Sequence, residues 1–279
     1  MPQTSLTHAS TPTPSEPPPK GELGFRARAL DGVAFSNLLP AAIAAGLSLT
    51  ASHALAAANP QRWALLAASG TFVVYGLDRL RDTTRDRTTA PRRTEFTEKH
   101  ARALSIAVAL AALLLVATLF TAPMRVILLC VVCGTTGLLH RRLKGLAALK
   151  SIYVSAAWVA ICAGIPAISG AVEPYLAWVA TIFFAALTAN LVASNLRDDE
   201  AQLLPGRPHS ALTLARALTA AGGLAAWVAP QQLAPLGWIP LAEAVALGFF
   251  RPSEHYGHLA VDGALLAGAL ASLLHFASH

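Results

Sequence analysis

Long apolar runs separated by short polar links dominate this sequence and restrict what it can fold into. Of its 279 residues, 54% are hydrophobic and only 13% are charged, whereas a soluble domain normally carries about a quarter charged residues. Several runs approach the length of about 20 apolar residues that an α-helix needs to cross a bilayer. Because backbone polar groups in lipid must be satisfied within the segment, the sequence predicts an all-α, polytopic membrane helix bundle.

Hydropathy divides the chain into a tail and about nine predicted transmembrane helices. Residues 1–22 are rich in Pro, Ser and Thr, and we expect them to form a disordered cytoplasmic tail. Residues 23–279 are expected to form one transmembrane domain, in which the short second and fourth spans continue as helix into their polar flanks. The nine predicted spans are Val33–Ala58, Trp63–Leu77, Ala103–Ala122, Arg125–Leu139, Leu149–Ser169, Pro174–Ser194, Ala211–Val228, Leu233–Phe250 and Leu259–Phe276.

The basic residues predict an orientation for these spans. With nine spans, all but two of the 21 Lys and Arg residues, Arg62 and Arg125, fall on the side of the amino terminus. The positive-inside rule assigns that side to the cytoplasm. We therefore expect an integral protein of the plasma or inner membrane, in contact with membrane lipid. Nucleic acid is not an expected partner despite the net charge of +6, because no basic recognition helix or aromatic stacking platform is present.

A segment rich in acidic and basic residues directly follows the second predicted span. Asp78, Asp82 and Asp86 recur every four residues, so on a helix they lie on one side. Stacked carboxylates repel one another unless a cation binds them, and Mg²⁺ takes one or two carboxylates together with phosphate oxygens. The interleaved basic residues, whose guanidinium groups match phosphate geometry, are Arg79, Arg81 and Arg85.

A second charged segment follows the sixth predicted span, on the same predicted side of the membrane. It reads Asn195-Leu-Arg-Asp-Asp-Glu and contains the carboxylates of Asp198, Asp199 and Glu200. Two such segments at one face could converge above a single cavity. There they would hold a diphosphate through Mg²⁺ bridges, with arginines neutralising the remaining oxygens.

With these motifs and spans, the chain resembles the UbiA superfamily of intramembrane prenyltransferases, whose members are nine-helix bundles. The family motif N-D-x-x-D-x-x-x-D after the second helix corresponds to residues 78–86 of this chain. The family motif D-x-x-x-D after the sixth helix corresponds to Asp198-x-x-x-Gln202. Arg79 stands where the first motif has an acid, and Gln202 stands where the second motif has its closing Asp. The resemblance covers roughly residues 30–276.

The resemblance implies a reaction and a set of site residues. The reaction is transfer of an isoprenoid chain from a prenyl diphosphate to an aromatic or other lipophilic acceptor, with Mg²⁺ as cofactor. Lys144 ends the pattern His140-x-x-x-Lys144, at the position of a basic pattern that the family often has after its fourth helix. The implied catalytic and metal-binding residues are Asp78, Asp82, Asp86 and Asp198, with Gln202 as a further, neutral metal ligand. The implied diphosphate-binding residues are Arg81, Arg85, Lys144, Lys150, Asn195 and Arg197.

The sequence also bears on other function classes. The departures at Arg79 and Gln202 leave open a non-catalytic membrane protein on the same fold that binds an isoprenoid or scaffolds a pathway. A transporter is disfavoured because the chain shows no internal repeat and no paired broken helices. A CDP-alcohol phosphotransferase is disfavoured because no Ala-Arg pair follows Asp31-Gly32 at the required offset.

Some polar residues outside the two motifs also bear on function. Glu243 and Asp262 lie within apolar runs, where ionisable groups are candidates for function, and Asp262 is expected near the membrane interface. His255 and His258, in the link before the last span, are expected to be surface histidines. The three cysteines, expected to be packing residues and not a disulfide or zinc site, are Cys130, Cys133 and Cys162.

Overall fold

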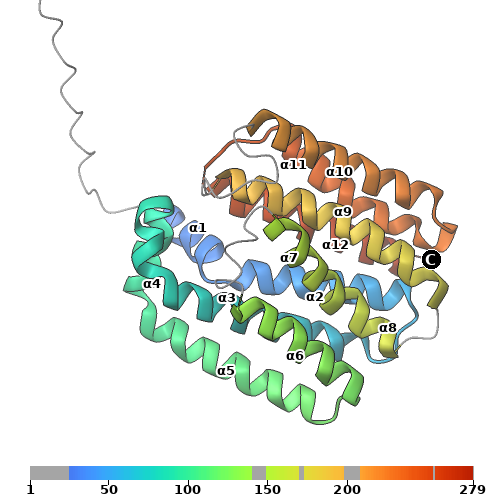
Figure 1. The fold of residues 1–279 in the computed structure, drawn as a ribbon, viewed down its shortest axis with the longest axis horizontal. Helices are drawn as coiled ribbons and strands as arrows, with labels where there is room; N and C mark the ends of the chain where they lie inside the picture. Colours follow the sequence, from blue (N-terminus) through green and yellow to red (C-terminus); the bar gives the residue numbers. More distant parts are fainter. Residues whose placement is uncertain (1–24, 140–148, 170–172, 198–207, 254, 279) are drawn as a thin grey trace, which may run out of the picture.

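The computed structural model describes residues 25–139, 149–169, 173–197, 208–253 and 255–278. Within these ranges the chain forms helices joined by turns and contains no β-strand, which confirms the all-α prediction. The helices run back and forth beside one another as a single bundle (Figure 1). The predicted tail, residues 1–22, lies outside the described residues.

The helices begin where the sequence supplies a start signal. Pro60, Pro91 and Pro208 are the first residues of three of them, a position where the missing N–H of proline costs no hydrogen bond. A short π-helical turn, η2, joins α7 and α8 into one rod, while the 3₁₀ helix η3 and the π-helical turn η4 lengthen α11 and α12 at their starts. In chain order the elements are α1 (Phe25–Phe35), α2 (Leu38–Ala54), α3 (Pro60–Thr89), α4 (Pro91–Lys99), α5 (Ala101–Phe120), α6 (Met124–Leu139), α7 (Lys150–Val159), η2 (Ala160–Gly164), α8 (Ile165–Ser169), α9 (Glu173–Arg197), α10 (Pro208–Val228), η3 (Gln231–Gly237), α11 (Trp238–Gly248), η4 (Tyr256–Asp262) and α12 (Gly263–Ala277).

Several of these rods are long and apolar enough to cross a membrane, which is the character of a membrane protein. In the described part of the chain there are five such rods, and the bent pair Ala29–Phe35 and Leu38–Ala54 adds a sixth if it counts as one span. The prediction of about nine spans is therefore not confirmed. The five rods are Ala101–Phe120, Lys150–Ser169, Pro174–Arg197, His209–Val228 and Tyr256–Ala277.

The remaining predicted spans are helical but fall short of this standard for different reasons. α3 has 30 residues, but its second half is charged because the helix continues to Thr89. This continuation confirms the expected extension of the second span. α6 has 16 residues, about 24 Å of helix at 1.5 Å per residue, which is shorter than the hydrocarbon core of a bilayer, about 30 Å. The eighth predicted span, Leu233–Phe250, forms the 3₁₀ helix η3 followed directly by α11 of 11 residues, so its α-helical part is short.

The centre of the bundle is formed by α2, α9 and α12. Their apolar side chains meet in a large buried cluster that includes Leu47, Phe183 and Leu265. α2 packs against α3 and α12, and α9 packs against α7 and α10. α12 also approaches α11 closely at Gly268, where an added Cβ would lie 2.6 Å from Cα of Ile239.

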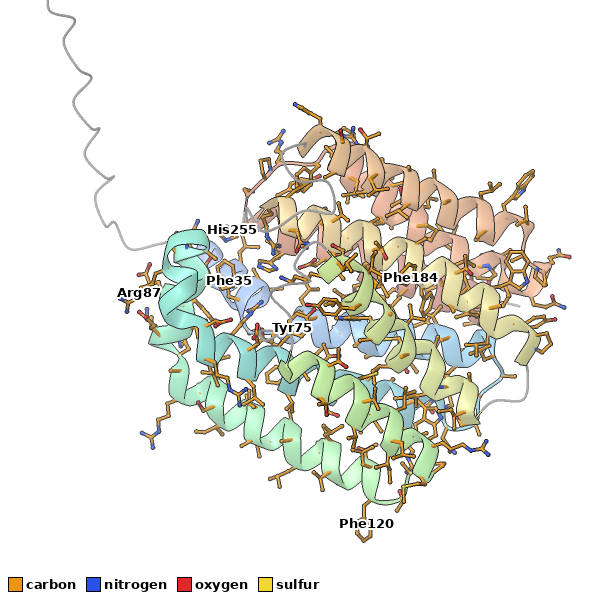
Figure 2. The ribbon with its side chains drawn as sticks, in the orientation of Figure 1. Phe35, Tyr75, Arg87, Phe120, Phe184 and His255 are labelled. Atoms are coloured by element: carbon orange, nitrogen blue, oxygen red, sulfur yellow. The ribbon has the colours of Figure 1, made fainter. Side chains whose placement is uncertain are left out.

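α5 lies at the edge of the bundle and turns most of its apolar surface outward. Only 11% of its span is buried, against 61% for Pro174–Arg197. Leu113, Val116 and Phe120 are each more than half exposed, and Phe120 projects away from the bundle (Figure 2). An exposed apolar face of this length is typical of contact with lipid.

One end of the bundle is shaped by the break between α1 and α2. Asn37 has a φ of 65°, in the left-handed region, and the helix axis bends by 56° at this point. Nη1 of Arg79 on α3 donates a hydrogen bond to the carbonyl oxygen of Phe35 at the end of α1. A cation at the last carbonyls of a helix satisfies an acceptor and complements the helix dipole. Arg79 therefore ties α3 to the break.

Candidate functional site

The first acidic segment lies on the second half of α3, within an unbroken helix. Asp78 and Asp82 are partly exposed and stand one helical turn apart, and Arg81 is exposed. The backbone of Arg85 and Asp86 continues the same helix, while their side chains lie outside what the structure describes. The helical spacing predicted for the three aspartates is therefore present.

The second acidic segment is described as far as Arg197, the last residue of α9. Asn195 is buried and donates from Nδ2 to Oγ of Ser151 on α7, at 3.1 Å. Arg197 reaches across to η4, where its Nη1 lies 3.5 Å from Nδ1 of His258. Arg197 follows this path over Gly257, because a Cβ at that position would lie 2.3 Å from Cδ of Arg197. The end of α9 is thus fixed against α7 and η4.

The structure describes only some of the other predicted site residues. Lys150 is the first residue of α7 and is partly exposed. Asp198, Gln202 and Lys144 lie outside the described residues. Among the side chains that the structure describes, no group of three or more His, Cys, Asp or Glu is arranged to hold a metal ion. Because this set leaves out Asp198 and the side chain of Asp86, the Mg²⁺ site stays a prediction.

Arg79, Arg93 and Arg197 bring positive charge from α3, α4 and α9 to the same end of the bundle. Burial, followed by the nearby charges of Arg93 and Arg197, lowers the pKa of Arg79 to about 9. Arg79 stays charged at neutral pH, so its guanidinium group is repelled by those of Arg93 and Arg197, and Asp262 supplies part of the opposing charge. Arginines crowded in this way are suited to bind an anion, because phosphate oxygens would replace the repulsion with charge-assisted hydrogen bonds.

A histidine and a carboxylate form a buried pair on η4, beside Arg197. Nδ1 of His258 lies 2.9 Å from Oδ2 of Asp262, and His258 is only 5% exposed. Asn190 of α9 donates from Nδ2 to the other oxygen, Oδ1 of Asp262, at 3.2 Å. The prediction that His258 is a surface residue is wrong, because the rod of α12 already begins with η4, which packs against α9.

Sequence reasoning missed this pair because it treated His258 and Asp262 separately. Their spacing of four residues is the signal that would have found them, since residues at this spacing lie on one side of a helix. Asn190 lies inside an apolar run without a charged neighbour, so no sequence pattern marked it as a partner. π-helical turns such as η4 are frequent at functional sites, but a single sequence does not reveal them.

The fully buried ring of Phe35 holds α1, α4 and η4 together at this end of the bundle. It packs edge-on against His255 and His258, with ring centroids 5.5 and 5.8 Å away, and lies tilted against Phe96 of α4 at 6.1 Å. Nε2 of His255 is hydrogen-bonded to Oδ1 of Asp31 on α1, at 2.8 Å. Phe35 and His255 lie close together at the end that α1 and α4 occupy (Figure 2).

Glu243 of α11 is a second buried carboxyl group, close enough to Asp262 for their charges to interact. It is fully buried, and neither of its oxygens makes a hydrogen bond with the described residues. An ionised carboxylate in this position would carry a large desolvation cost, so we expect Glu243 to be uncharged.

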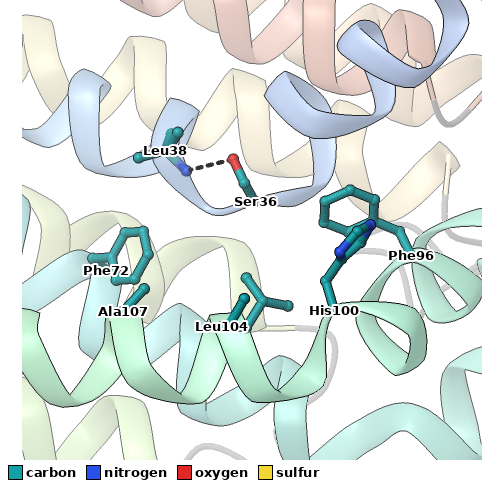
Figure 3. A pocket seen from close by; sticks show the side chains of 8 residues that line it. Ser36, Leu38, Phe72, Phe96, His100, Leu104 and Ala107 are labelled. Atoms are coloured by element: carbon teal, nitrogen blue, oxygen red, sulfur yellow. Dashed lines mark hydrogen bonds between the residues drawn. The ribbon is translucent and has the colours of Figure 1, made fainter. Parts of the chain in front are cut away.

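An apolar pocket of about 280 Å³ lies beside the α1–α2 break, between α3, α4 and α5 (Figure 3). The backbone N–H of Leu38 donates to Oγ of Ser36 at 3.4 Å within its wall. Within the described part of the chain, no residue of the two acidic segments lines this pocket. Its lining residues are Ser36, Leu38, Phe72, Phe96, His100, Ala103, Leu104 and Ala107.

No protein-family model, curated protein or solved structure matches the chain. The resemblance to the UbiA superfamily therefore depends on the spacing of the motifs and on the helices that carry them.

Proposed function

We propose that the protein is a Mg²⁺-dependent membrane prenyltransferase, which transfers an isoprenoid chain from a prenyl diphosphate to an aromatic or other lipophilic acceptor. The observation that supports this most directly is the crowding of Arg79, Arg93 and Arg197 beside the acidic face of α3. A diphosphate needs both cations and metal-binding carboxylates. The long apolar helices next to this cluster suit a hydrocarbon chain attached to the diphosphate.

The carboxylates at this end of the bundle have the chemistry that Mg²⁺ requires. Asp78 and Asp82 offer oxygen donors one turn apart on α3, and Mg²⁺ prefers oxygen ligands that it shares with phosphate groups. In this proposal Asp86, Asp198 and the amide of Gln202 complete the set. When bound, Mg²⁺ supplies positive charge that stabilises the diphosphate as a leaving group.

The basic residues divide into two roles. Arg81 and Arg197 donate to diphosphate oxygens and stabilise the charge that grows as the bond to the prenyl chain breaks. Arg79 is held by the carbonyl of Phe35, so it contributes positive charge and fixes α1 and is not a metal ligand. Further cations assigned to the diphosphate are Arg85, Lys144 and Lys150, and Asn195 supplies an amide.

The reaction begins with ionisation. The bond between C1 of the prenyl chain and the diphosphate oxygen breaks, and the electron pair stays on the diphosphate. The allylic cation that remains is shielded from water by apolar helices. An electron-rich acceptor then supplies the electrons for the new bond.

The aspartates test this proposal directly. Purified protein is incubated with Mg²⁺, radiolabelled prenyl diphosphate and a panel of aromatic acceptors. Asp82→Ala and Asp198→Ala are each expected to lower transfer by about 10²- to 10³-fold or more, with the helical circular dichroism signal unchanged. Glu98→Ala is the matched control, because Glu98 lies at the same end of the helix bundle. Its Oε1 forms an exposed ion pair with Nη2 of Arg87 at 2.7 Å. Such pairs contribute little, so full activity is expected.

Other outcomes would decide against the assignment. Normal turnover by both Asp82→Ala and Asp198→Ala would refute the site. Tight, Mg²⁺-dependent binding of a prenyl diphosphate with no product across the panel would instead favour a non-catalytic isoprenoid-binding protein. The residues that motivate this alternative are Arg79 and Gln202, which replace acids of the family motifs.

A further inference from the structure

We propose that His258 accepts the proton that the acceptor substrate loses during prenyl transfer, and that Asp262 and Asn190 position it. This inference rests on the proposed function. It limits the acceptor to a molecule that loses a proton when it is prenylated. Such a molecule carries a phenolic hydroxyl group or an electron-rich aromatic ring.

The hydrogen bonds of His258 determine which ring nitrogen can accept a proton from the acceptor. Nδ1 lies 2.9 Å from Oδ2 of Asp262, and a carboxylate can only accept, so Nδ1 carries the proton and Nε2 presents its lone pair. Nε2 makes no hydrogen bond with the residues that the structure describes. Asn190 holds the other carboxylate oxygen at 3.2 Å. Here Asp262 orients the imidazole base, and Asn190 orients Asp262. Enzymes use a base that is oriented by a carboxylate in this way for proton transfer.

The position of His258 places this base where the reaction would occur. Arg197, a predicted ligand of the diphosphate, lies 3.5 Å from its Nδ1. The charged groups that face the imidazole are Arg197 from α9, Arg79 from α3 and Asp262 from η4. His255, which also packs against Phe35, is bonded to Asp31 and not to the imidazole of His258. Because His258 is only 5% exposed, bulk water has little access to it.

The proton transfer balances without a further reagent. A ring carbon or hydroxyl oxygen of the acceptor supplies the electron pair for the bond to C1 of the prenyl chain, and the diphosphate has already left with the electrons of the C1–O bond. The joined product carries one proton too many. That proton passes to Nε2 of His258, and the electrons of the broken C–H or O–H bond restore the aromatic ring or the ether oxygen.

The variant His258→Asn separates proton transfer from structure. An asparagine amide can still donate to Asp262 but has no basic nitrogen. Transfer to a phenolic acceptor is expected to fall by about 10²- to 10⁴-fold. The dissociation constant of prenyl diphosphate is expected to change less than about twofold. The slow Mg²⁺-dependent release of diphosphate without acceptor, in which water captures the prenyl cation in both proteins to give a prenyl alcohol, is expected to be equally unchanged.

The pH profile gives a second readout that a purely structural role would not move. Transfer by the unmodified protein is expected to decline as the pH falls and the imidazole becomes protonated, and His258→Asn is expected to lack this acid limb. Asp262→Asn is expected to shift the limb without removing it. His255→Asn is the matched control, three residues away and bonded to Asp31, and is expected to keep both the rate and the limb.

The possible failures are distinguishable. If His258→Asn transfers at the normal rate with an unchanged pH profile, this inference is wrong and the proposed function stands. If it loses diphosphate release together with transfer, His258 has a structural role and the inference is equally wrong. If the unmodified protein neither binds prenyl diphosphate nor releases diphosphate from it, the proposed function fails and this inference fails with it.

Discussion

At the charged end of the bundle, contacts with other helices set the directions of single arginine side chains. Arg79 is buried and bonded to a backbone carbonyl, so it cannot turn away from its neighbours. Arg197 is steered by the absence of a side chain at Gly257, where a Cβ would lie 2.3 Å from Cδ and 2.5 Å from Nη1 of Arg197. The direction of a guanidinium group is therefore set by a glycine on another helix.

Gly257→Ala should displace Arg197 while leaving its charge in place. We expect the affinity for prenyl diphosphate to fall by about 10- to 100-fold, because a hydrogen bond to a charged group is worth roughly 1.5–3 kcal/mol. Isothermal titration with a prenyl diphosphate and Mg²⁺ measures this change. Gly248→Ala, at a glycine with open space around it, serves as the control and should bind normally. Equal affinities for both variants would show that Arg197 does not contact the diphosphate.

At the scale of elements, small residues determine how closely the helices approach. Gly76 brings α3 against α5, because an added Cβ would lie 2.3 Å from Cγ2 of Val108. Gly268 brings α12 against α11, where the neighbouring atoms are backbone: Cα of Ile239 at 2.6 Å and the carbonyl oxygen of Trp238 at 2.8 Å. Close contacts at small residues are the usual means by which helices associate in membranes.

Gly268→Ala is expected to destabilise the bundle, because backbone atoms cannot rotate away from a new methyl group as a side chain can. Overpacking of this kind costs about 1–3 kcal/mol, which a thermal melt in detergent would detect as a lower midpoint. Gly263→Ala on the same helix, with nothing within 4 Å of the added Cβ, should melt at or above the normal temperature. Identical midpoints for the two variants would contradict the close contact between α11 and α12.

At the scale of the whole molecule, the antiparallel path of the helices collects the charged segments at one end. α3 and α9 finish there, and η4 begins there, so residues far apart in the chain meet. The turn between α5 and α6 and the link between α10 and α11, which contains η3, lie toward the other end (Figure 1). In a membrane this arrangement would expose the two sets of residues on opposite sides.

Labelling of single cysteines tests that arrangement and the predicted orientation. After Cys130, Cys133 and Cys162 are replaced by alanine, cysteines are introduced one at a time at four exposed positions. One pair of positions, at the charged end, is Arg87→Cys and Ser253→Cys, and the other pair is Thr121→Cys and Gln231→Cys. A membrane-impermeant maleimide added to intact cells should label only Thr121→Cys and Gln231→Cys. In permeabilised cells it should label all four.

Two contrary results would have different meanings. Reversal of the labelling pattern would overturn the orientation predicted from the basic residues and leave the bundle intact. Labelling of Arg87→Cys and Ser253→Cys from opposite sides would contradict the convergence of α3 and η4 at one end.

The sequence by itself determined the helical class and the position of most helices, because both follow from local properties. Apolar runs bury their backbone groups as helix wherever they occur, and the spacing of Asp78 and Asp82 fixes their angular relation on α3. The same local reasoning predicted about nine spans, whereas five or six rods in the described part of the chain are long and apolar enough to cross a membrane. Charge and helix length vary within a run, as the second half of α3 and the short α6 and α11 show.

Only the tertiary structure decided which polar side chains face one another. Asn190 and Asp262 are 72 residues apart in the chain, and nothing in either local sequence identifies the other. Arg79 reads as a departure from a metal-binding motif, yet the break at Asn37 gives it a carbonyl to bind on α1. These contacts depend on how closely whole helices pack and at which register, so they are set by the sum of many apolar contacts and by no short stretch of sequence.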